Sequence, residues 1–394
     1  METVAFLVQR IGPYHHARLC AWTAARPGAV KVIEFRPGDT VYAAWGTVEE
    51  NGAYARRQTC SREELCRALD ELQPRVVVCV GYADPEIHQA MAWALRKRVP
   101  LITCSDSTFE SQPRSRAKEV FKRLVLAPFD AALVAGHRSH AYLESLGLGV
   151  ARRFQPWDVV DNAYFERGAD ASRLKAESVR AKYHLPPRYF LCVARFIPEK
   201  KLERLVEAYA HYVALAGRDA WSLVLPGSGP LETQLRASVA AAGLEAKVQF
   251  PGFLHYQDLP AVYGLAGAFV FQSVADTWGL VVNEAMAAGL PMLVSSRCGC
   301  APDLVREGGN GFVYDPENVP QLAGLLTQLA NMNDARRAAM GQQSREMIKE
   351  FSPEAFAQGM EAAIACVLTR RRAGKSWFIR MPINLLARRS PPNS

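Results

Sequence analysis

Two carboxylates, Asp276 and Glu284, lie eight residues apart in the stretch DTWGLVVNEAMAAGLP, residues 276–291. Gly279 predicts the start of a helix and Gly289 predicts its end. Glu284 is the single acid of this otherwise apolar helix, which disfavours the alternative of an ordinary surface glutamate. Because carboxylates accept hydrogen bonds from sugar hydroxyls, both side chains are suited to a polyhydroxyl ligand that lies across the helix start.

The start of this helix also predicts an anion site. The N–H groups around Trp278, Gly279 and Leu280 would have no partner within the helix and would favour a negative charge. Two cations follow another apolar run, YFLCVA, with Arg195 directly after it and Lys200 five residues later. A planar guanidinium and a compact ammonium together suit a diphosphate. A solvated basic turn is the alternative for these two cations taken alone.

Two glycine-containing loops follow neighbouring apolar runs. Gly227 and Gly229 come after SLVLP and permit a close backbone approach, although alone they are typical of a turn and do not form a dinucleotide-binding GxGxxG fingerprint. Phe253 follows the run VQFPG. Because open parallel sheets bind ligands at the carboxyl ends of their strands, we expect all these loops to converge.

Short apolar runs that alternate with helical periods predict the elements that position these loops. The strand-like runs are residues 4–8, 75–80, 100–104, 131–136, 189–194, 221–227, 248–252, 268–272 and 291–296. The predicted helix between two of them has a packed face at three-four spacing, made of Leu202, Leu205, Val206, Tyr209 and Val213. Strand–helix alternation of this kind is typical of parallel sheets covered by helices.

The elements fall into two blocks, separated near the polar stretch 166–187. The predicted fold is α/β, with two Rossmann-like, doubly wound parallel-sheet domains that face each other across a cleft, the usual place for a ligand. We expect the domains at residues 1–170 and 171–350. A helix at 351–369 is expected to return to the first domain, and a basic amphipathic tail follows at 370–394.

The C-terminal half resembles the retaining glycosyltransferases of family 4, which have the GT-B architecture. The matching stretches are, in order, VARFIPEKK, LPGSGPLE, VQFPGF, DTWGLVVNEAMAAGLP and EGGNGFVYDPEN, within about residues 188–350. The resemblance implies a hexosyltransferase that moves a sugar from a nucleotide-diphosphate sugar to an acceptor with retention of configuration. The acceptor would be a glycan or a lipid-linked saccharide of polysaccharide biosynthesis. It would bind to the N-terminal domain and the donor to the C-terminal domain.

By resemblance, Arg195 and Lys200 hold the donor diphosphate, and Glu284 binds the nucleotide ribose. Phe253 lies where the base is cradled, and Gly227 belongs to a neighbouring substrate-binding loop. The sequence has no Asp-x-Asp metal motif. The cations and the helix start would therefore neutralise the leaving diphosphate without a metal or another cofactor.

By the same resemblance, Asp276 and the backbone from Trp278 to Leu280 hold the donor sugar. The family usually has a glutamate at the position of Asp276, whose side chain is shorter by a methylene. Because of this departure, we expect the sugar hydroxyl that Asp276 contacts to indicate which donor sugar the protein uses.

The N-terminal half offers candidates for an acceptor site. Family members often place a histidine after a strand near the reacting carbon, and the comparable stretch here, PLITCSDST, has Asp106 and no histidine. Asp106 is suited to accept or orient a proton, as are His15 and His16 after the first strand. A structural role is the alternative for every histidine, including His88.

Two basic amphipathic segments make an anionic membrane surface a further candidate partner. Residues 114–129 combine apolar and basic positions at helical spacing, although a surface helix packed on its own domain is the preferred interpretation. The tail, residues 370–394, mixes aromatic and aliphatic side chains with seven basic residues and no acid, which suits an anionic bilayer. A disordered basic tail is the alternative.

Composition limits the remaining classes of protein. The chain has 394 residues and a net charge of +8, but without the seven tail cations it has 40 basic and 39 acidic residues, which argues against a nucleic-acid groove. The nine scattered cysteines favour a reducing cytoplasm, and the apolar runs are too short to cross a bilayer. We expect a cytoplasmic protein, peripheral on the inner face of the membrane if the tail docks there.

Two other functions stay open on the sequence alone. One is another GT-B enzyme, such as a sugar-nucleotide epimerase or a phosphorylase, although no lysine stands out for the pyridoxal phosphate of a phosphorylase. The other is a non-catalytic nucleotide-sugar-binding protein, which the missing histidine and Asp276 leave open.

Overall fold

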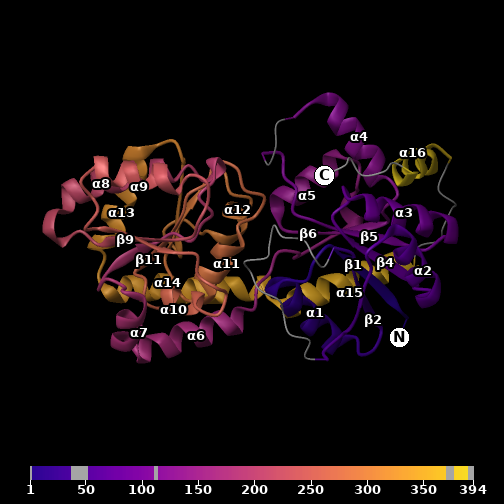
Figure 1. Ribbon diagram of the computed structural model, residues 1–394, viewed down its shortest axis with the longest axis horizontal. Coiled ribbons are helices and arrows are strands. Elements are labelled where there is room, and N and C mark those ends of the chain that lie inside the picture. Colours follow the sequence, from indigo (N-terminus) through magenta and orange to yellow (C-terminus); the bar gives the residue numbers. More distant parts are fainter. Residues whose placement is uncertain (1, 37–51, 111–113, 370–376, 389–394) are drawn as a thin grey trace. The chain divides into compact units, whose positions relative to one another are not determined.

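The computed structural model describes most of the chain, namely residues 2–36, 52–110, 114–369 and 377–388. The chain forms two compact units, each with its own parallel sheet (Figure 1). Met1–Val159 with Pro353–Ser394 make up the N-terminal unit, and Val160–Ser352 make up the C-terminal unit. The predicted α/β class with two Rossmann-like domains is therefore confirmed.

The N-terminal unit contains, within its described residues, a seven-stranded parallel sheet. In spatial order its strands are β3 (Ala55–Gln58), β2 (Val30–Glu34), β1 (Val4–Val8), β4 (Val76–Val80), β5 (Leu101–Ser105), β6 (Ala131–Val134) and β7 (Arg153–Phe154). Val4 pairs with Val30 on one side and with Val76 on the other. The central strands are continuous apolar runs because both faces of a parallel sheet are buried.

Helices cover both faces of this sheet. They are α1 (Pro13–Ala25), α2 (Arg62–Leu72), α3 (Pro85–Lys97), α4 (Arg116–Leu126), α5 (His137–Ser145) and α15 (Pro353–Thr369). α15 comes from the far end of the chain and packs against α1, β6 and β7. Trp22 Nε1 of α1 donates to Glu361 Oε1 of α15 at 2.7 Å, which ties this late helix to the first one.

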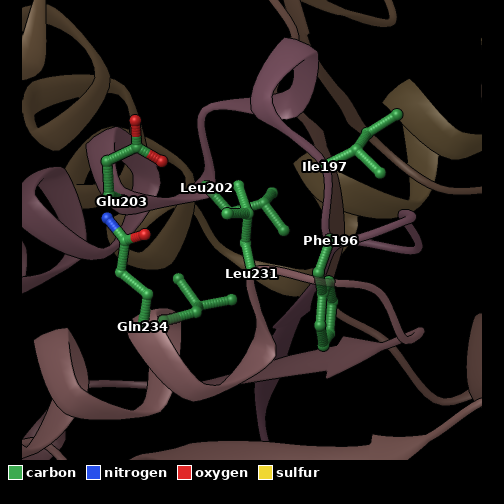
Figure 2. Close-up of a pocket in the computed structure, with 7 residues that line it drawn as sticks. Phe196, Ile197, Leu202, Glu203, Leu231 and Gln234 are labelled. Carbon is green, nitrogen blue, oxygen red and sulfur yellow. The ribbon is translucent and has the colours of Figure 1, made fainter.

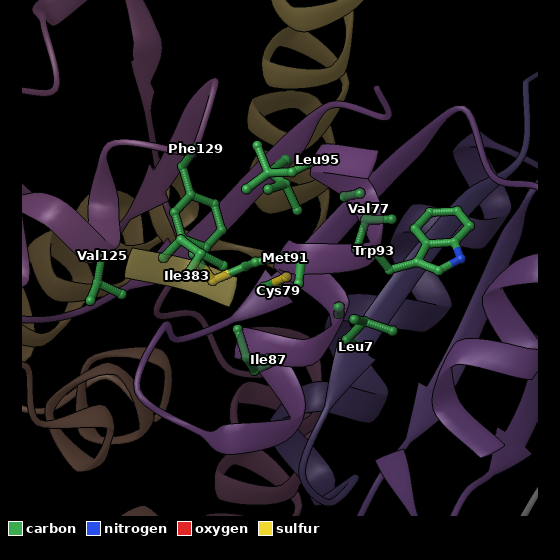
Figure 3. Close-up of a cluster of buried hydrophobic side chains, with 14 of the residues drawn as sticks. Leu7, Val77, Cys79, Ile87, Met91, Trp93, Leu95, Val125, Phe129 and Ile383 are labelled. Atoms are coloured by element: carbon green, nitrogen blue, oxygen red, sulfur yellow. The ribbon is translucent and has the colours of Figure 1, made fainter. Parts of the chain in front are cut away.

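A further helix, α16 (Trp377–Arg388), packs along α3. Ile383 of α16 is fully buried in the same apolar cluster as Met91 of α3 (Figure 3). The alternative of a disordered tail is wrong for these twelve residues, which form a helix. The rest of the predicted tail, 370–376 and 389–394, lies outside the described residues.

The C-terminal unit, whose residues are all described, contains a six-stranded parallel sheet. In spatial order its strands are β10 (Val248–Gly252), β9 (Ser222–Pro226), β8 (Tyr189–Leu191), β11 (Ala268–Phe271), β12 (Met292–Ser295) and β13 (Gly311–Tyr314). The order changes direction at β8, so the loops after β8 and β11 flank the point where such sheets bind ligands.

Helices again cover both faces of the sheet. They are α6 (Asn162–Leu174), α7 (Ala176–Tyr183), α8 (Leu202–Ala216), α9 (Glu232–Ala241), α10 (Leu259–Gly264), α11 (Leu280–Ala287), α12 (Ala301–Leu304), α13 (Val319–Asn331) and α14 (Asp334–Ile348). The predicted face of α8 is buried and packs against α13.

The boundary between the units differs from the predicted one. Residue 170 falls inside α6, which packs against α10 and α11 of the C-terminal unit. Gly168 explains the fit, because a Cβ there would lie 2.5 Å from Cβ of Pro260. The chain therefore changes units at Val159–Val160, about a helix earlier than the polar stretch suggests.

Candidate functional site

The predicted loops meet at the carboxyl edge of the C-terminal sheet. Phe196 N of the loop after β8 donates to Ser228 O of the loop after β9 at 2.9 Å. Val274 N, after β11, donates to Glu199 O at 2.8 Å. Gly299 N, after β12, donates to Asp276 O at 3.0 Å. Four loops are thus joined through their backbones, as the strand order requires.

Lys200 and Asp276 form an ion pair within this cluster of loops. Lys200 Nζ donates to Asp276 Oδ2, and the ammonium also lies 4.6 Å from the ring centroid of Phe271. The other carboxylate oxygen of Asp276 accepts from Trp278 N at 3.3 Å. Lys200 is buried and its partner half-buried, so the pair is well shielded from water. Asp276 therefore links the cation to the backbone just before α11.

Arg195 has a different environment from Lys200. Its side chain is exposed and makes no hydrogen bond or ion pair with any part of the chain that the structure describes. Phe196, the next residue of the same loop, lines a cavity of about 10 Å³ together with Leu202 and Leu231 (Figure 2). This cavity has room for about one water molecule, so it serves packing and is not a ligand site.

The glycines bring the loops together. Gly227 has φ +147°, and a Cβ there would lie 1.8 Å from Ala194 O. Gly229 has φ +158°, and a Cβ would lie 2.5 Å from Phe196 O. The close backbone approach that the sequence predicted is therefore made by another loop of the same chain, the loop after β8. Gly227 shapes the loop that carries Arg195.

Helix α11 begins where the sequence predicted. Gly279 has φ +104°, and a Cβ there would lie 2.5 Å from the ring of Phe271, so only glycine fits this cap. Gly279 and Leu280 are half-buried at the helix start. Trp278 is buried, donates from Nε1 to Asn283 Oδ1 at 2.9 Å and packs on Phe351 at 5.4 Å between ring centroids. The indole anchors the loop, and Trp278 N already donates to Asp276, so the N–H groups of Gly279 and Leu280 are the ones that face a candidate ligand.

Glu284 is fully buried in α11, so the alternative of a surface glutamate is wrong. One carboxylate oxygen accepts from Tyr263 Oη of α10 at 2.7 Å. Burial and then the negative charge of Glu284 raise the pKa of Tyr256, which keeps that phenol protonated. Sequence reasoning found the acid and missed Tyr263, whose signal is only a tyrosine in a short apolar helix.

Phe253 lies just beyond β10 at the same sheet edge and is 40% exposed. Its ring meets His255 edge to face, with 5.6 Å between ring centroids. Gly252, with φ +80°, turns the chain immediately before it. An exposed aromatic ring at this place is available to a planar ligand group.

In the N-terminal unit, Asp106 follows β5 and contributes to the electrostatics of Arg18 of α1. Arg18 is buried, pairs with Asp158 at 3.3 Å and stacks on Trp157 at 4.1 Å. Burial lowers the pKa of Arg18, and the negative charges of Asp158 and Asp106 oppose that shift. Sequence reasoning missed this cluster, because its members lie 140 residues apart in the chain.

The histidines of the N-terminal unit have separate environments. His16 Nδ1 lies 3.0 Å from Tyr54 Oη, and His88 Nε2 lies 3.0 Å from Tyr82 O. Burial lowers the pKa of His88, as expected for its structural role. Burial and then the charge of Arg18 lower the pKa of His15 to about 3. His15 is therefore a neutral imidazole at neutral pH.

The described residues contain neither a metal-binding cluster nor a membrane-spanning helix. No group of three or more His, Cys, Asp or Glu side chains there is arranged to hold a metal ion. Nor does any helix in the described ranges combine the length and apolarity needed to span a membrane.

Comparisons with known proteins find similarity to glycosyltransferases. Residues 176–347 match the family model described as Glycosyl transferases group 1. A GDP-mannose-dependent alpha-(1-6)-phosphatidylinositol monomannoside mannosyltransferase of Mycobacterium tuberculosis is 29% identical over 198 residues, 47% of this chain and 50% of that protein. A 2-deoxystreptamine glucosyltransferase of Streptomyces kanamyceticus is 35% identical over 179 residues, 45% of each chain. The aligned part thus spans about half the length of these curated relatives.

Solved structures extend the likeness to the whole fold. The Anabaena protein HepE in complex with UDP superposes with a TM-score of 0.72 at 17% identity, over 92% of this chain and 99% of that one. Sucrose-phosphate synthase of Thermosynechococcus elongatus gives 0.71 at 19% identity, over 93% and 99%. At these identities the likeness establishes the two-domain GT-B fold and nothing finer.

Proposed function

We propose that this protein transfers a hexose from a nucleotide-diphosphate sugar to an acceptor, because residues 176–347 match the family model described as Glycosyl transferases group 1. The observation that carries the proposal is the arrangement at the carboxyl edge of the C-terminal sheet. Exposed Arg195 lies in the same loop as the Lys200–Asp276 pair, and that pair joins the start of α11. Cations, sugar-binding carboxylates and free helix N–H groups are what a sugar diphosphate requires.

In this proposal Arg195 and Lys200 bind the two phosphates. An ammonium has three donors, so Lys200 can keep Asp276 and still donate to a phosphate oxygen. Asp276 then stays next to the leaving diphosphate and accepts from a hydroxyl of the donor sugar. The N–H groups at Gly279 and Leu280 add to the neutralisation of the diphosphate.

Glu284 and Phe253 would hold the nucleoside. A carboxylate has about four acceptor positions, so Glu284 can accept from ribose hydroxyls while Tyr263 keeps its hydrogen bond. This requires the donor to reach a side chain that is fully buried, and α11 or its loop would have to open slightly. Phe253 supplies an exposed ring for the base.

The acceptor site belongs to the N-terminal unit in this proposal. Asp106 near the Arg18–Asp158 pair is the candidate to orient the acceptor hydroxyl, with His16 as a second polar contact. The relatives are named for a phosphatidylinositol mannoside and for 2-deoxystreptamine, so they include a lipid-linked and a small polar acceptor. We propose a glycan or lipid-linked saccharide, bound in the cytoplasm or at its membrane face.

We further propose retention of configuration, with attack on the face that the diphosphate leaves, and no metal requirement. This proposal is supported by the positive charge at the carboxyl edge of the C-terminal sheet, since Arg195, Lys200 and the start of α11 can neutralise the leaving diphosphate.

Incubation with a panel of nucleotide sugars and acceptors, followed by NMR of the products, tests the proposal. We expect transfer from one donor, an unchanged anomeric configuration and full activity in EDTA. Epimerised donor in the absence of acceptor would instead indicate an epimerase. Donor binding without transfer or hydrolysis for every acceptor class would indicate a non-catalytic binding protein.

A further inference from the structure

Helix α4 of the N-terminal unit exposes its apolar stripe. Val120, Phe121 and Leu124 are 60%, 48% and 43% exposed. With Ala117, also exposed, they occupy one face at three-four spacing, and only Val125 and Leu126 at the end of the helix are buried. The preferred interpretation from sequence, a helix whose apolar face packs on its own domain, is therefore wrong for most of this face.

Basic side chains flank this stripe. Arg116 and Lys118 are exposed and make no side-chain hydrogen bond or ion pair with the described residues. Lys122 and Arg123 follow on the next turn. The one acid of the helix, Glu119, is already held by Arg114 at 2.8 Å and by Tyr142 Oη at 3.1 Å. The face thus carries an uncompensated positive charge.

A second helix, α16, lies beside α4 and also exposes apolar side chains. α16 packs on α3 through Ile383 and contacts α4, so the two helices lie side by side (Figure 1). Its Met381 and Leu385 point away from the core and are exposed. The sequence of α16 contains two arginines and no acid.

We propose that this face, made of Val120, Phe121 and Leu124 of α4 with Met381 and Leu385 of α16, docks on an anionic lipid bilayer. The apolar side chains would enter the headgroup region, and Arg116 and Lys118 would contact lipid phosphates. The docking places the protein on the membrane without crossing it. The inference goes beyond the proposed transfer reaction and does not depend on it.

The chemistry of the face favours a bilayer over a protein partner. A stable protein interface covers about 800 Å² on each partner, and its core is depleted of lysine. Here five scattered apolar side chains are bordered by lysines and arginines. That is the pattern of a helix lying in a membrane interface.

Sedimentation with vesicles of phosphatidylcholine, alone or mixed with phosphatidylglycerol, tests this proposal. We expect the full chain to bind only the mixed vesicles. Phe121→Ser with Leu124→Ser should weaken binding about tenfold or more. Arg116→Glu with Lys118→Glu should weaken it similarly, since each cation near the surface adds about fivefold.

Matched variants of exposed residues in the C-terminal unit serve as controls. Leu174→Ser with Leu215→Ser, and Arg167→Glu with Lys175→Glu, change the same kinds of side chain and should bind as the natural protein does. Equal binding by test and control variants would overturn the proposal. So would the absence of binding, or equal binding to both kinds of vesicle.

Hydrogen exchange supplies a readout that does not depend on a variant folding. Mixed vesicles should slow exchange across Arg116–Leu126 and leave Leu202–Ala216 of α8 unchanged. Protection of α4 that appears with protein concentration and without vesicles would show a second copy of the chain on this face instead, and would overturn the proposal.

Discussion

At the scale of single residues, the candidate site depends on two carboxylates, the half-buried Asp276 and the fully buried Glu284. Asp276 holds Lys200, and Glu284 holds Tyr263. The sequence indicates both acids as candidate site residues, because their spacing and their apolar neighbours can be read from it. It could not predict the partners, since Lys200 lies 76 residues from Asp276 and Tyr263 is one tyrosine among many.

Replacement of Asp276 by Asn should destabilise the C-terminal unit. The change leaves the buried Lys200 without its counter-charge. Breaking a fully buried pair costs about 3–5 kcal/mol, and partial exposure of Asp276 should reduce this to about 2 kcal/mol. Urea unfolding measures the loss. The neighbouring exposed pair Lys201–Glu317 is the control, for which Glu317→Gln should cost at most about 0.5 kcal/mol. Equal losses would contradict the assignment.

Tyr263→Phe should weaken donor binding through Glu284. The carboxylate loses a donor at 2.7 Å and with it a fixed orientation toward the ribose. Tyr189→Phe is the matched control, because Tyr189 Oη donates at 2.6 Å to Val262 O of the same helix, α10. Both variants should lose about 1–2 kcal/mol of stability. Only Tyr263→Phe should raise KM for the donor, and a parallel rise for Tyr189→Phe would count against a positioning role.

His15 predicts a pH dependence of stability. Its folded pKa is lowered from 6.5 to about 3 by burial and by Arg18. As pH falls from about 6.5 toward 3, the unfolded chain takes up a proton that the folded chain does not, so the free energy of unfolding decreases. The slope is at most about 1.4 kcal/mol per pH unit. Denaturation of the natural protein and of His15→Gln at pH 7 and pH 5 measures it, and an identical pH dependence would contradict this.

At the scale of elements, the strands that the sequence predicted are mostly apolar runs, whereas β2, β3, β7 and β13 were not among the predicted runs. Buried runs such as β4 and β11 stand out in the sequence because a parallel sheet is covered on both faces. β3, Ala-Arg-Arg-Gln, was missed because it lies at the sheet edge, where Arg56 pairs with Glu34 of β2. The predicted boundary at residue 170 falls inside α6 for a different reason, because the packing of α6 on α10 depends on Gly168 and cannot be read from polarity.

Gly227→Ala tests whether the loop after β9 is built on close contact. Both positive φ and a Cβ 1.8 Å from Ala194 O oppose the substitution. Gly243 has φ +66° but nothing within 4 Å of a Cβ, so Gly243→Ala isolates the backbone effect. We expect a loss of about 1–2 kcal/mol for Gly243→Ala and clearly more for Gly227→Ala. Similar thermal stabilities would show that the loop can move away.

At the scale of the whole molecule, the two-domain class was predictable from the sequence. The placement of the C-terminal segment in the N-terminal unit was predictable only in part. Strand–helix alternation runs through both halves of the sequence, and a solved structure superposes over 92% of the chain, whereas the family model covers residues 176–347 alone. α16 was harder, because its basic residues suggested a tail, whereas Ile383 packs it onto α3. The bilayer hypothesis therefore moves from the tail as a whole to a defined face of α4 and α16.

Thermal unfolding with a panel of nucleotide sugars measures whether a sugar diphosphate binds at the carboxyl edge of the C-terminal sheet. One donor should raise the melting temperature of the natural protein in proportion to the logarithm of its concentration above Kd. Arg195→Ala should abolish this shift without lowering the ligand-free melting temperature, because Arg195 makes no side-chain hydrogen bond or ion pair with the described residues. No shift with any nucleotide sugar, or an undiminished shift in Arg195→Ala, would show that this edge of the sheet does not bind the donor diphosphate.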